Sequence, residues 1–198
     1  MELTLDLLQK LVWMDFRLAV LFTVVLPLGL LLWAVIQNAQ AITQLLIIYW
    51  RIASLLAITV YLMIAQWPVS YVSGFAALIL IPLSLWFWVD LNEEVADRRD
   101  TLGLVFNSWR WGVTLYCILA ALGQAVFLDC AFIPGAIRRT ACQAWLQPPL
   151  MFKAMFHAQA KPGTLGFFAV VALVIYVLYL GYFVFIRLPK QGRSATGL

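Results

Sequence analysis

Charged residues are scarce in this sequence. Only 11% of its 198 residues are Asp, Glu, Lys or Arg, whereas 65% are hydrophobic. A soluble domain carries about 25% charged residues, because its surface must be hydrated. The net charge of +4 comes from scattered bases, which does not suggest a nucleic-acid partner. The composition therefore predicts an integral membrane protein, and its length predicts one membrane domain over residues 1–198.

Histidine is almost absent, which excludes several kinds of active site. His157 is the only histidine, so one chain cannot supply bis-histidine haem ligation, a di-iron carboxylate–histidine centre or a histidine-rich zinc site. A serine or cysteine hydrolase would need His157 as its base, and the sequence contains no nucleophile-elbow motif. We therefore predict no catalytic residues and no metal ligands, and a protein that is not an enzyme.

His157 itself has two interpretations. It follows an aromatic and methionine-rich stretch and shares a stripe with Lys153 and Lys161. Its imidazole is a candidate ligand for one chlorophyll magnesium. A solvated or headgroup-contacting histidine is the simpler interpretation of a side chain flanked by lysines.

The apolar residues form five continuous runs. A membrane core about 30 Å thick needs roughly 20 helical residues, and the runs have about this length, unlike the alternating segments of a β-barrel. Pro27 and Pro82 each remove a backbone donor inside a run, which predicts a kink. Only Arg51 places a full charge within a run. The predicted transmembrane helices cover residues 18–37, 45–64, 72–89, 111–128 and 164–186.

Two further segments predict interfacial amphipathic helices. Residues 2–17 place polar side chains at helical spacing opposite a leucine-rich side, which predicts an interfacial helix leading into the first span. Residues 129–163 form the largest loop outside the membrane. Pro148 and Pro149 are expected to interrupt this loop, so that a second interfacial helix covers residues 150–160.

The most polar stretch runs from Asp90 to Asp100 and places four carboxylates on one helical face. Such a face can hold a divalent cation. The spacing is similar to the acidic motif of membrane-bound phosphatidyltransferases, but Glu94 stands where that family has glycine, and no second aspartate pair follows. A solvated turn paired with Arg98 and Arg99 is the simpler interpretation.

Arg51 needs a partner, because a guanidinium at the centre of a membrane helix costs about 2.5–3.5 kcal/mol on insertion scales. The start of the second span and the end of the third lie on the same side of the membrane in a five-span protein. Asp90 follows the third span directly. The sequence therefore predicts an ion pair between Arg51 and Asp90.

The fourth predicted span carries a stripe of small residues. Cys117, Ala121 and Ala125 recur at intervals of four, and Gln124 lies beside them. Small side chains allow helices to approach closely, and an amide can form a hydrogen bond across the contact. This face is expected to contact either another span of the same chain or a partner protein.

The sequence contains only weak signals for the orientation of the protein in the membrane. Lysine and arginine are divided almost evenly between the two sides of a five-span arrangement. Cys130 and Cys142 share the long loop and can form a disulfide if that loop faces an oxidising compartment, although their spacing alone leaves the bridge open. We predict that the amino terminus and the loop lie outside and that the carboxy terminus is cytoplasmic.

Two segments carry a resemblance. They are Asp15-Phe-Arg-Leu-Ala-Val and Leu46-Ile-Ile-Tyr-Trp-Arg-Ile-Ala-Ser-Leu-Leu, and with the chain's size and long penultimate loop they resemble a family of small uncharacterised polytopic membrane proteins of cyanobacteria. The resemblance implies a thylakoid or plasma membrane location and an association with photosystem assembly. It implies no catalytic residues. The abundant aromatic side chains would suit contact with chlorophyll or a carotenoid but do not require a pigment.

These observations favour a non-enzymatic accessory or assembly protein of a larger photosynthetic or respiratory membrane complex. Its partners would be bound through apolar helix faces within the lipid bilayer. Two alternatives belong to other classes. One is a membrane-embedded lipid-modifying enzyme that uses the acidic stretch from Asp90 to Asp100, and the other is a small-solute transporter or channel.

Overall fold

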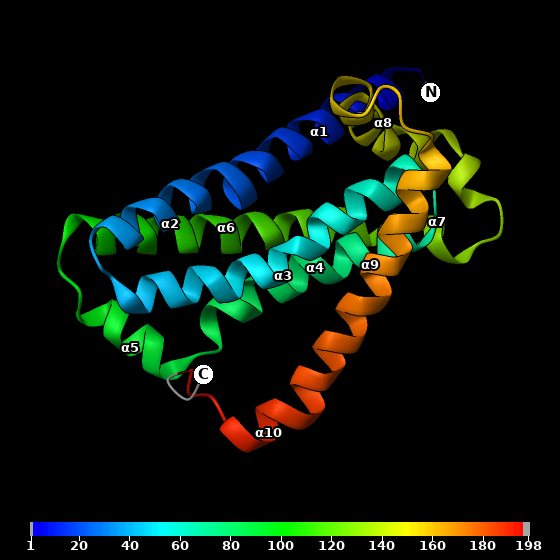
Figure 1. Ribbon diagram of the computed structural model, residues 1–198. Coiled ribbons are helices and arrows are strands. Elements are labelled where there is room, and N and C mark those ends of the chain that lie inside the picture. The colour runs from blue at the N-terminus through cyan, green and yellow to red at the C-terminus, as the bar shows by residue number, and fades with distance from the viewer. Residues whose placement is uncertain (1, 196–198) are drawn as a thin grey trace.

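The structure, a computed structural model, describes residues 2–195, which contain helices and no strands. The predicted all-α class is therefore confirmed for this part of the chain. Figure 1 shows the labelled helices. In chain order the elements are α1 Glu2–Val20, a π-helix Leu21–Val25, α2 Leu26–Ile36, α3 Gln40–Ile64, α4 Val69–Trp86, α5 Val89–Asp97, α6 Thr101–Ala125, α7 Asp129–Phe132, a 3₁₀ turn Ala136–Arg138, α8 Thr140–Phe156, α9 Pro162–Tyr182, a π-helix Phe183–Arg187 and α10 Leu188–Gln191.

Within the described residues, four helical segments are long and apolar enough to cross a membrane. They contain most of the first, second, third and fifth predicted spans. The fourth prediction, 111–128, falls on α6, which is not one of these four. The helix begins at Thr101, so Asn107 and Arg110 lie inside it rather than before it. The four segments are Leu5–Ile36, Gln40–Ile64, Val69–Trp86 and Pro162–Lys190.

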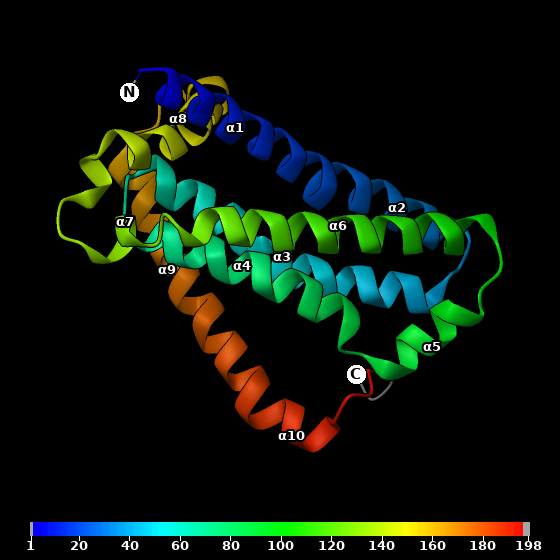
Figure 2. The ribbon, with the colours of Figure 1, turned by 180° about the vertical axis from the view of Figure 1, so that it is seen from behind.

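Helix α3 lies at the centre of the molecule. It packs against α2, α4, α5, α8 and α9, and α4 packs in turn against α6. Figures 1 and 2 show α2, α3, α4 and α6 side by side, with α7 and α8 at one end of the bundle and α5 at the other. Helix α9 starts beside the α7 end of α3 and diverges from the bundle towards α10. The bundle therefore has one open side.

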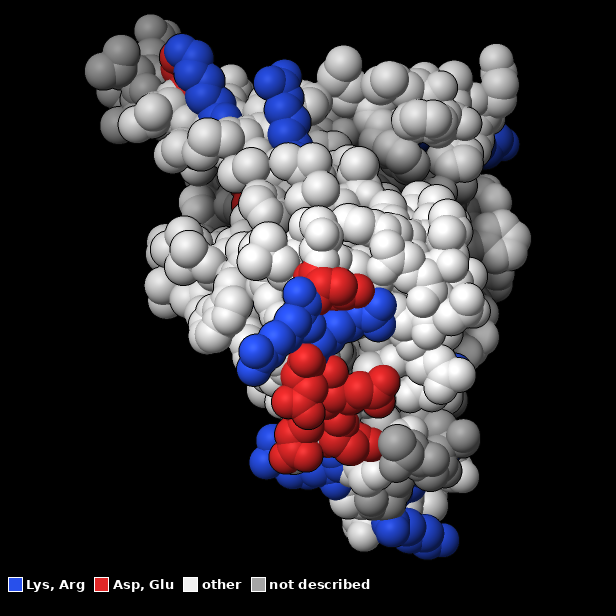
Figure 3. All heavy atoms as spheres, turned by 90° about the vertical axis from the view of Figure 1, so that its left-hand side faces the viewer, with Lys and Arg blue, Asp and Glu red and all other residues white. Residues whose placement is uncertain are grey.

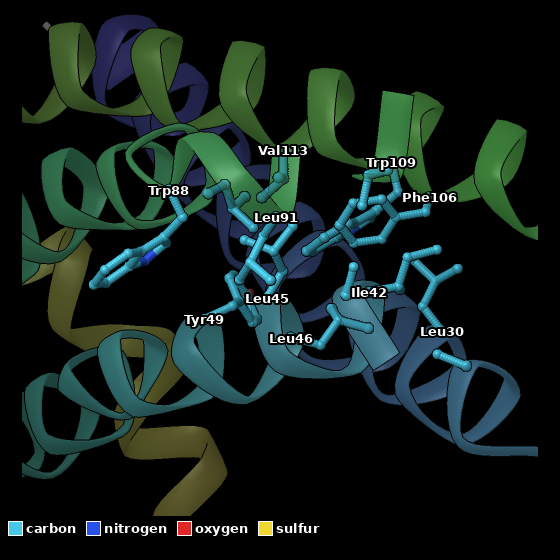
Figure 4. Close-up of a cluster of buried hydrophobic side chains, with 14 of the residues drawn as sticks. Leu30, Ile42, Leu45, Leu46, Tyr49, Trp88, Leu91, Phe106, Trp109 and Val113 are labelled. Atoms are coloured by element: carbon cyan, nitrogen blue, oxygen red, sulfur yellow. The ribbon is translucent and has the colours of Figure 1, made fainter. Parts of the chain in front are cut away.

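The largest hydrophobic core lies between α2, α3, α4, α5 and α6, and Figure 4 shows part of it. Leu45, Leu46 and Tyr49 on α3 are fully buried against Phe106 and Trp109 of α6. The rings of Tyr49 and Trp109 meet edge to face, with centroids 5.2 Å apart. Edge-to-face packing of this kind is favourable and directional, so it fixes α3 against α6.

The π-helix that joins α1 to α2 is explained by Pro27. A proline has no backbone N–H, so the carbonyl of Thr23 loses its helical donor. In the π-helix, the N–H of Leu26 donates to Leu21, which leaves the Phe22 carbonyl unbonded by the helix as well. Side chains of the core replace both donors: Tyr49 Oη donates to the Thr23 oxygen at 2.7 Å, and Trp109 Nε1 donates to the Phe22 oxygen at 2.9 Å.

The prediction of a separate amino-terminal interfacial helix is not supported by the described residues. Helix α1, the π-helix and α2 form one continuous helical rod up to Ile36. At about 1.5 Å per residue this rod is roughly 50 Å long, which exceeds the membrane core. Its amino-terminal part packs against α8. The polar pattern of residues 2–17 thus marks the end of a long helix.

The second predicted interfacial helix, 150–160, has the wrong bounds. Helix α8 includes both Pro148 and Pro149 and ends at Phe156. Prolines inside a helix remove hydrogen bonds and normally interrupt it. Here both prolines are buried, and Tyr71 Oη of α4 donates to the Cys142 carbonyl at 2.7 Å. This bond lies in the first turn of α8, and the helix continues through both prolines, where the sequence predicts a break.

Candidate functional site: the groove beside α9

Arg51 lies in the middle of α3, which spans 25 residues, and its side chain is exposed. Its Nη1 donates a long hydrogen bond of 3.5 Å to Tyr179 Oη of α9. None of the ion pairs among the described residues includes Arg51. The structure thus places a guanidinium at mid-helix in a segment apolar enough to cross a membrane, with a phenol as its partner.

The side chain of Arg51 lines a groove of about 340 Å³ that lies between α3, α4 and the carboxy-terminal half of α9. The groove exists because α9 diverges from the bundle (Figures 1 and 2). Its walls are mainly leucine, isoleucine, phenylalanine and tryptophan side chains. The polar groups among its lining residues are those of Arg51, Ser84, Trp88, Tyr176 and Tyr179.

Helix α9 contacts the bundle along a narrow face. A Cβ placed on Gly166 would lie 2.4 Å from Ala65 Cβ, so the two backbones approach closely only because residue 166 is glycine. Further along, Tyr176 Oη donates to the Ile52 carbonyl at 3.5 Å. In the most apolar part of Pro162–Lys190 only 11% of residues are buried, against 39% for α3 and 44% for α4.

The outer face of α9 is therefore apolar and is not covered by any of the residues that the structure describes. Its large side chains include an aromatic pair near the start of the helix and a run of branched aliphatic residues below. Those that are more than half exposed are Phe167, Phe168, Val174, Ile175, Val177, Leu178 and Tyr182. We call these residues, together with the groove that contains Arg51, the α9 surface.

The predicted ion pair between Arg51 and Asp90 is not formed. Asp90 Oδ2 instead accepts hydrogen bonds from the Ala195 backbone N–H at 2.8 Å and from Ser194 Oγ at 3.1 Å. The backbone of Arg193 adds a bond, because its carbonyl accepts from the Val89 N–H at 3.2 Å. The carboxy-terminal segment thus returns to the start of α5 and occupies the carboxylate that was expected to neutralise Arg51.

The acidic stretch forms a patch on the outside of α5, flanked by basic side chains (Figure 3). Arg98 donates to both carboxylate oxygens of Asp100, at 2.9 and 2.8 Å. The Arg98 guanidinium and the N–H of Gly103 hold the pKa of the Asp100 carboxyl below its usual range. Asp100 also caps α6, since its Oδ1 accepts from Gly103 N at 2.8 Å.

No three carboxylates of α5 converge on a common point in the part of the chain that the structure describes. The one group of three possible ligands there is Asp129, Cys130 and Cys142, whose ligand atoms lie within 4.8 Å of one another. Cys130 and Cys142 are joined by a disulfide, the pairing that their spacing left open, so their sulfurs are not thiolates. Bridged sulfurs are not available as metal ligands.

The role of Arg110 was not predicted from the sequence, in which it counted only as one of the bases outside the spans. The residue is buried, and its guanidinium lies over the Trp86 ring at 4.0 Å. Its Nη1 donates to Asn92 Oδ1, and its Nη2 donates to Asn107 Oδ1 at 2.7 Å. The spacing of Asn107 and Arg110, one helical turn apart, was the available signal. This cluster ties α4, α5 and α6 together.

The small-residue stripe of α6 faces its own chain. Cys117 is fully buried in the core, and Ala121 and Ala125 line a shallow apolar groove against α4. Gln124 Nε2 donates to the Tyr71 carbonyl of α4 at 3.4 Å. Cys117 and Gln124 therefore contact the same chain, whereas Ala125 is exposed.

His157 lies at the end of α8, and its Nε2 is 2.8 Å from Tyr61 Oη of α3. The ring also contacts Phe152 and Tyr61, with centroid distances of 6.0 and 5.6 Å. In this arrangement Nε2 is occupied, so only Nδ1 is left as a possible ligand atom without breaking a hydrogen bond. The imidazole thus connects α8 to α3.

Comparisons with known proteins identify a family and nothing narrower. The model of a family described as "Protein of unknown function (DUF3177)" matches residues 9–196. No curated protein matches the chain. No solved structure matches it either.

Proposed function

The chain belongs to the DUF3177 family, and we propose that it is a non-enzymatic accessory or assembly protein whose α9 surface binds a transmembrane helix of a larger membrane complex. One observation carries this proposal: Arg51 is exposed at the middle of a membrane-type helix, and a tyrosine hydroxyl is its partner. A partner helix with an acidic residue would neutralise the guanidinium at low cost, since charges within a membrane normally pair.

The α9 surface has the composition that such a contact needs. The exposed side chains of Leu83, Tyr179 and Val184 line the groove, and Arg51 supplies one polar contact that can set the register of the partner. Polar groups within membranes act in this way because hydrocarbon offers them no alternative partner. The family resemblance extends the proposal to a photosynthetic or respiratory complex in a thylakoid or plasma membrane of a cyanobacterium.

The proposal includes five membrane crossings, with α6 as the fourth. Helix α6 has 25 residues and lies alongside α3 and α4. Its Arg110 is shielded from lipid by Trp86 and two asparagines, which removes the main obstacle to insertion. The amino terminus and the disulfide-bearing loop would then lie outside, and residues 90–100 and the tail in the cytoplasm.

Topology reporters test this arrangement. A reporter that is active only in the cytoplasm is fused after Arg99 and, in a separate fusion protein, after Leu198. Five crossings with this orientation predict activity from both fusions. Activity from the Arg99 fusion with loss from the Leu198 fusion would instead show that α6 does not cross the membrane.

Co-purification tests the binding function. The protein is isolated with a mild detergent from its native membrane, and associated proteins are identified by mass spectrometry. We expect Arg51→Gln to release the partner, whereas Arg99→Gln, which removes an exposed charge beside α5, should retain it. A photoreactive residue at position 178 should crosslink to the same partner. Crosslinks to lipid alone, with no protein lost from Arg51→Gln, would refute the proposal.

A further inference from the structure

Two tyrosines of α9 meet two neighbouring residues of α3 at the groove. Tyr179 Oη lies 3.5 Å from Arg51 Nη1, and Tyr176 Oη lies 3.5 Å from the Ile52 carbonyl oxygen. Tyr176 and Tyr179 are three residues apart, so they lie on one face of α9. Both contacts are at the long end of the hydrogen-bonding range, which makes them weak. Helix α9 therefore brings the Tyr179 hydroxyl to Arg51 without fully satisfying the guanidinium.

The donors at this point are accessible. Arg51 is exposed, Tyr179 is 46% exposed, and both side chains line the groove. A guanidinium carries five N–H donors, and its contact with Tyr179 is the one side-chain hydrogen bond of Arg51 among the described residues. Tyr179 is the acceptor in that contact, so its own O–H is left to donate to another group. None of the described residues that line the groove is Asp or Glu. The groove thus presents a cation and a phenolic donor to an acceptor that its own lining lacks.

The position of Arg51 along α3 limits which anion can reach it. Arg51 lies eleven residues after Gln40 and thirteen before Ile64, the two ends of α3, which corresponds to about 16 Å and 20 Å of helix. The phosphate of a lipid headgroup lies at the membrane surface, outside a hydrocarbon core about 30 Å thick. An acidic side chain of a transmembrane helix is instead held at the depth that its place in the helix sets. The depth of Arg51 therefore favours Asp or Glu of another helix over a lipid headgroup.

A carboxylate matches these two donors. Its two oxygens can accept from two N–H groups of a guanidinium, or from one N–H group and a neighbouring hydroxyl. Hydrogen bonds to an ionised group are about twice as strong as those between neutral groups. Within the chain, Asp90 was the expected source of this carboxylate, and the carboxy-terminal segment occupies it. The carboxylate must therefore come from another molecule.

We infer that Arg51 and Tyr179 form a two-donor site for a carboxylate, which an Asp or Glu at the middle of a partner transmembrane helix supplies. Arg51 provides the charge, and the Tyr179 hydroxyl provides a donor for the second carboxylate oxygen. This inference rests on the proposed function, and it adds the chemical group that is recognised and the second residue that recognises it.

Synthetic helices test the site without the native partner. Each is a leucine–alanine transmembrane peptide with a dansyl group, and it carries Glu at its centre, Gln at its centre or Glu near one end. The full chain is reconstituted with each peptide in phosphatidylcholine vesicles in mildly alkaline buffer, and energy transfer from its tryptophans to the dansyl group reports binding. We expect the central Glu peptide to bind about tenfold more tightly than the other two. Equal binding of all three peptides, or of the two Glu peptides, would overturn the inference.

Single substitutions test the role of each donor. Arg51→Gln should remove the preference for the central Glu peptide over the Gln peptide. Tyr179→Phe keeps the aromatic ring and should weaken binding of the central Glu peptide about three- to fifteenfold, the range for one hydrogen bond between membrane helices. Tyr182→Phe is the matched control, because Tyr182 is exposed on the same helix and does not line the groove. Equal effects of the two tyrosine variants would contradict the role of Tyr179.

The same variants separate this inference from the proposed function. Arg51 and Tyr179 are both exposed, so the variants should keep the thermal unfolding midpoint of the unmodified protein. Loss of the native partner from Arg51→Gln but not from Tyr179→Phe would leave the proposed function standing and overturn the two-donor site. Selective binding of the central Glu peptide, with no native partner found by co-purification, would support the two-donor site and refute the proposed function.

Discussion

The guanidinium carbon of Arg110 lies 4.0 Å from the centroid of the Trp86 ring, so a buried cation of α6 is stacked on an aromatic ring of α4. Trp86 is held in place because its Nε1 donates to Thr114 Oγ1 at 3.0 Å. Asn92 and Asn107 accept from the two terminal nitrogens of the guanidinium. A charge that would oppose membrane insertion is thereby enclosed by the protein itself.

Arg110→Met should destabilise the fold. The substitution keeps an unbranched apolar stem but leaves the side-chain carbonyls of Asn92 and Asn107 without their donor. We expect the free energy of unfolding in detergent to fall by about 1–3 kcal/mol, the cost of unsatisfied buried polar groups. Arg99→Met removes an exposed charge and serves as the control. Equal midpoints for the two variants would contradict this account of the cluster.

Gly166→Ala should weaken the attachment of α9 to α3. The added methyl group would lie 2.4 Å from Ala65 Cβ, so the helices must separate. We expect a loss of about 1–3 kcal/mol, typical of overpacking, measured as a lower thermal midpoint. Gly181→Ala is the matched control on the same helix, since its Cβ would meet no heavy atom within 4 Å. A similar loss in both variants would exclude close approach as the cause.

The disulfide should be detectable by alkylation. The chain contains three cysteines, of which Cys117 is free and buried. Denatured protein should therefore take up one alkyl group before reduction and three afterwards, as measured by mass spectrometry. Reduction should lower stability by roughly 2–4 kcal/mol, and the double variant Cys130→Ser, Cys142→Ser should not respond to reductant. Three alkyl groups without reduction would disprove the bridge.

The cap of α6 should respond to pH. The pKa of Asp100 lies below its ordinary value of 3.8, because Arg98 donates to the carboxylate. A depressed pKa in the folded state stabilises the fold above the unfolded pKa, and this contribution is lost as the pH falls through the folded value. The amide proton of Gly103 should therefore titrate in NMR spectra with a midpoint below 3.8. Asp100→Asn should abolish the titration, and a midpoint above 3.8 would contradict the pairing with Arg98.

Several features of the fold were predictable because they depend on local composition. Four of the five predicted spans fall on helices that are apolar enough to cross a membrane. Hydropathy detects such segments since lipid selects apolar side chains residue by residue. The fourth predicted span, residues 111–128, falls on α6, which is not one of these four, and α6 includes Asn107 and the buried Arg110, which are bonded to each other.

The predictions that were wrong concern features that depend on contacts between residues distant in the sequence. Arg51 was expected to meet Asp90, but the carboxy-terminal segment folds back and binds that carboxylate. Pro148 and Pro149 predicted a break in α8, but the helix continues through both prolines, which are buried. Neither the partner of Asp90 nor the continuity of α8 can be read from the neighbouring sequence, because each depends on segments that are remote in the chain and pack there in the folded protein.

The sequence by itself determined the helical class and the apolar character of the long segments: only 11% of the residues are charged, and continuous apolar runs of about 20 residues favour helices that are able to cross a membrane. The tertiary structure alone decided where the few polar groups act. It exposed Arg51 in the groove beside α9 and enclosed Arg110 behind Trp86. The polarity of a side chain sets its preference for water or lipid, but the packing of the helices decides which residues it contacts.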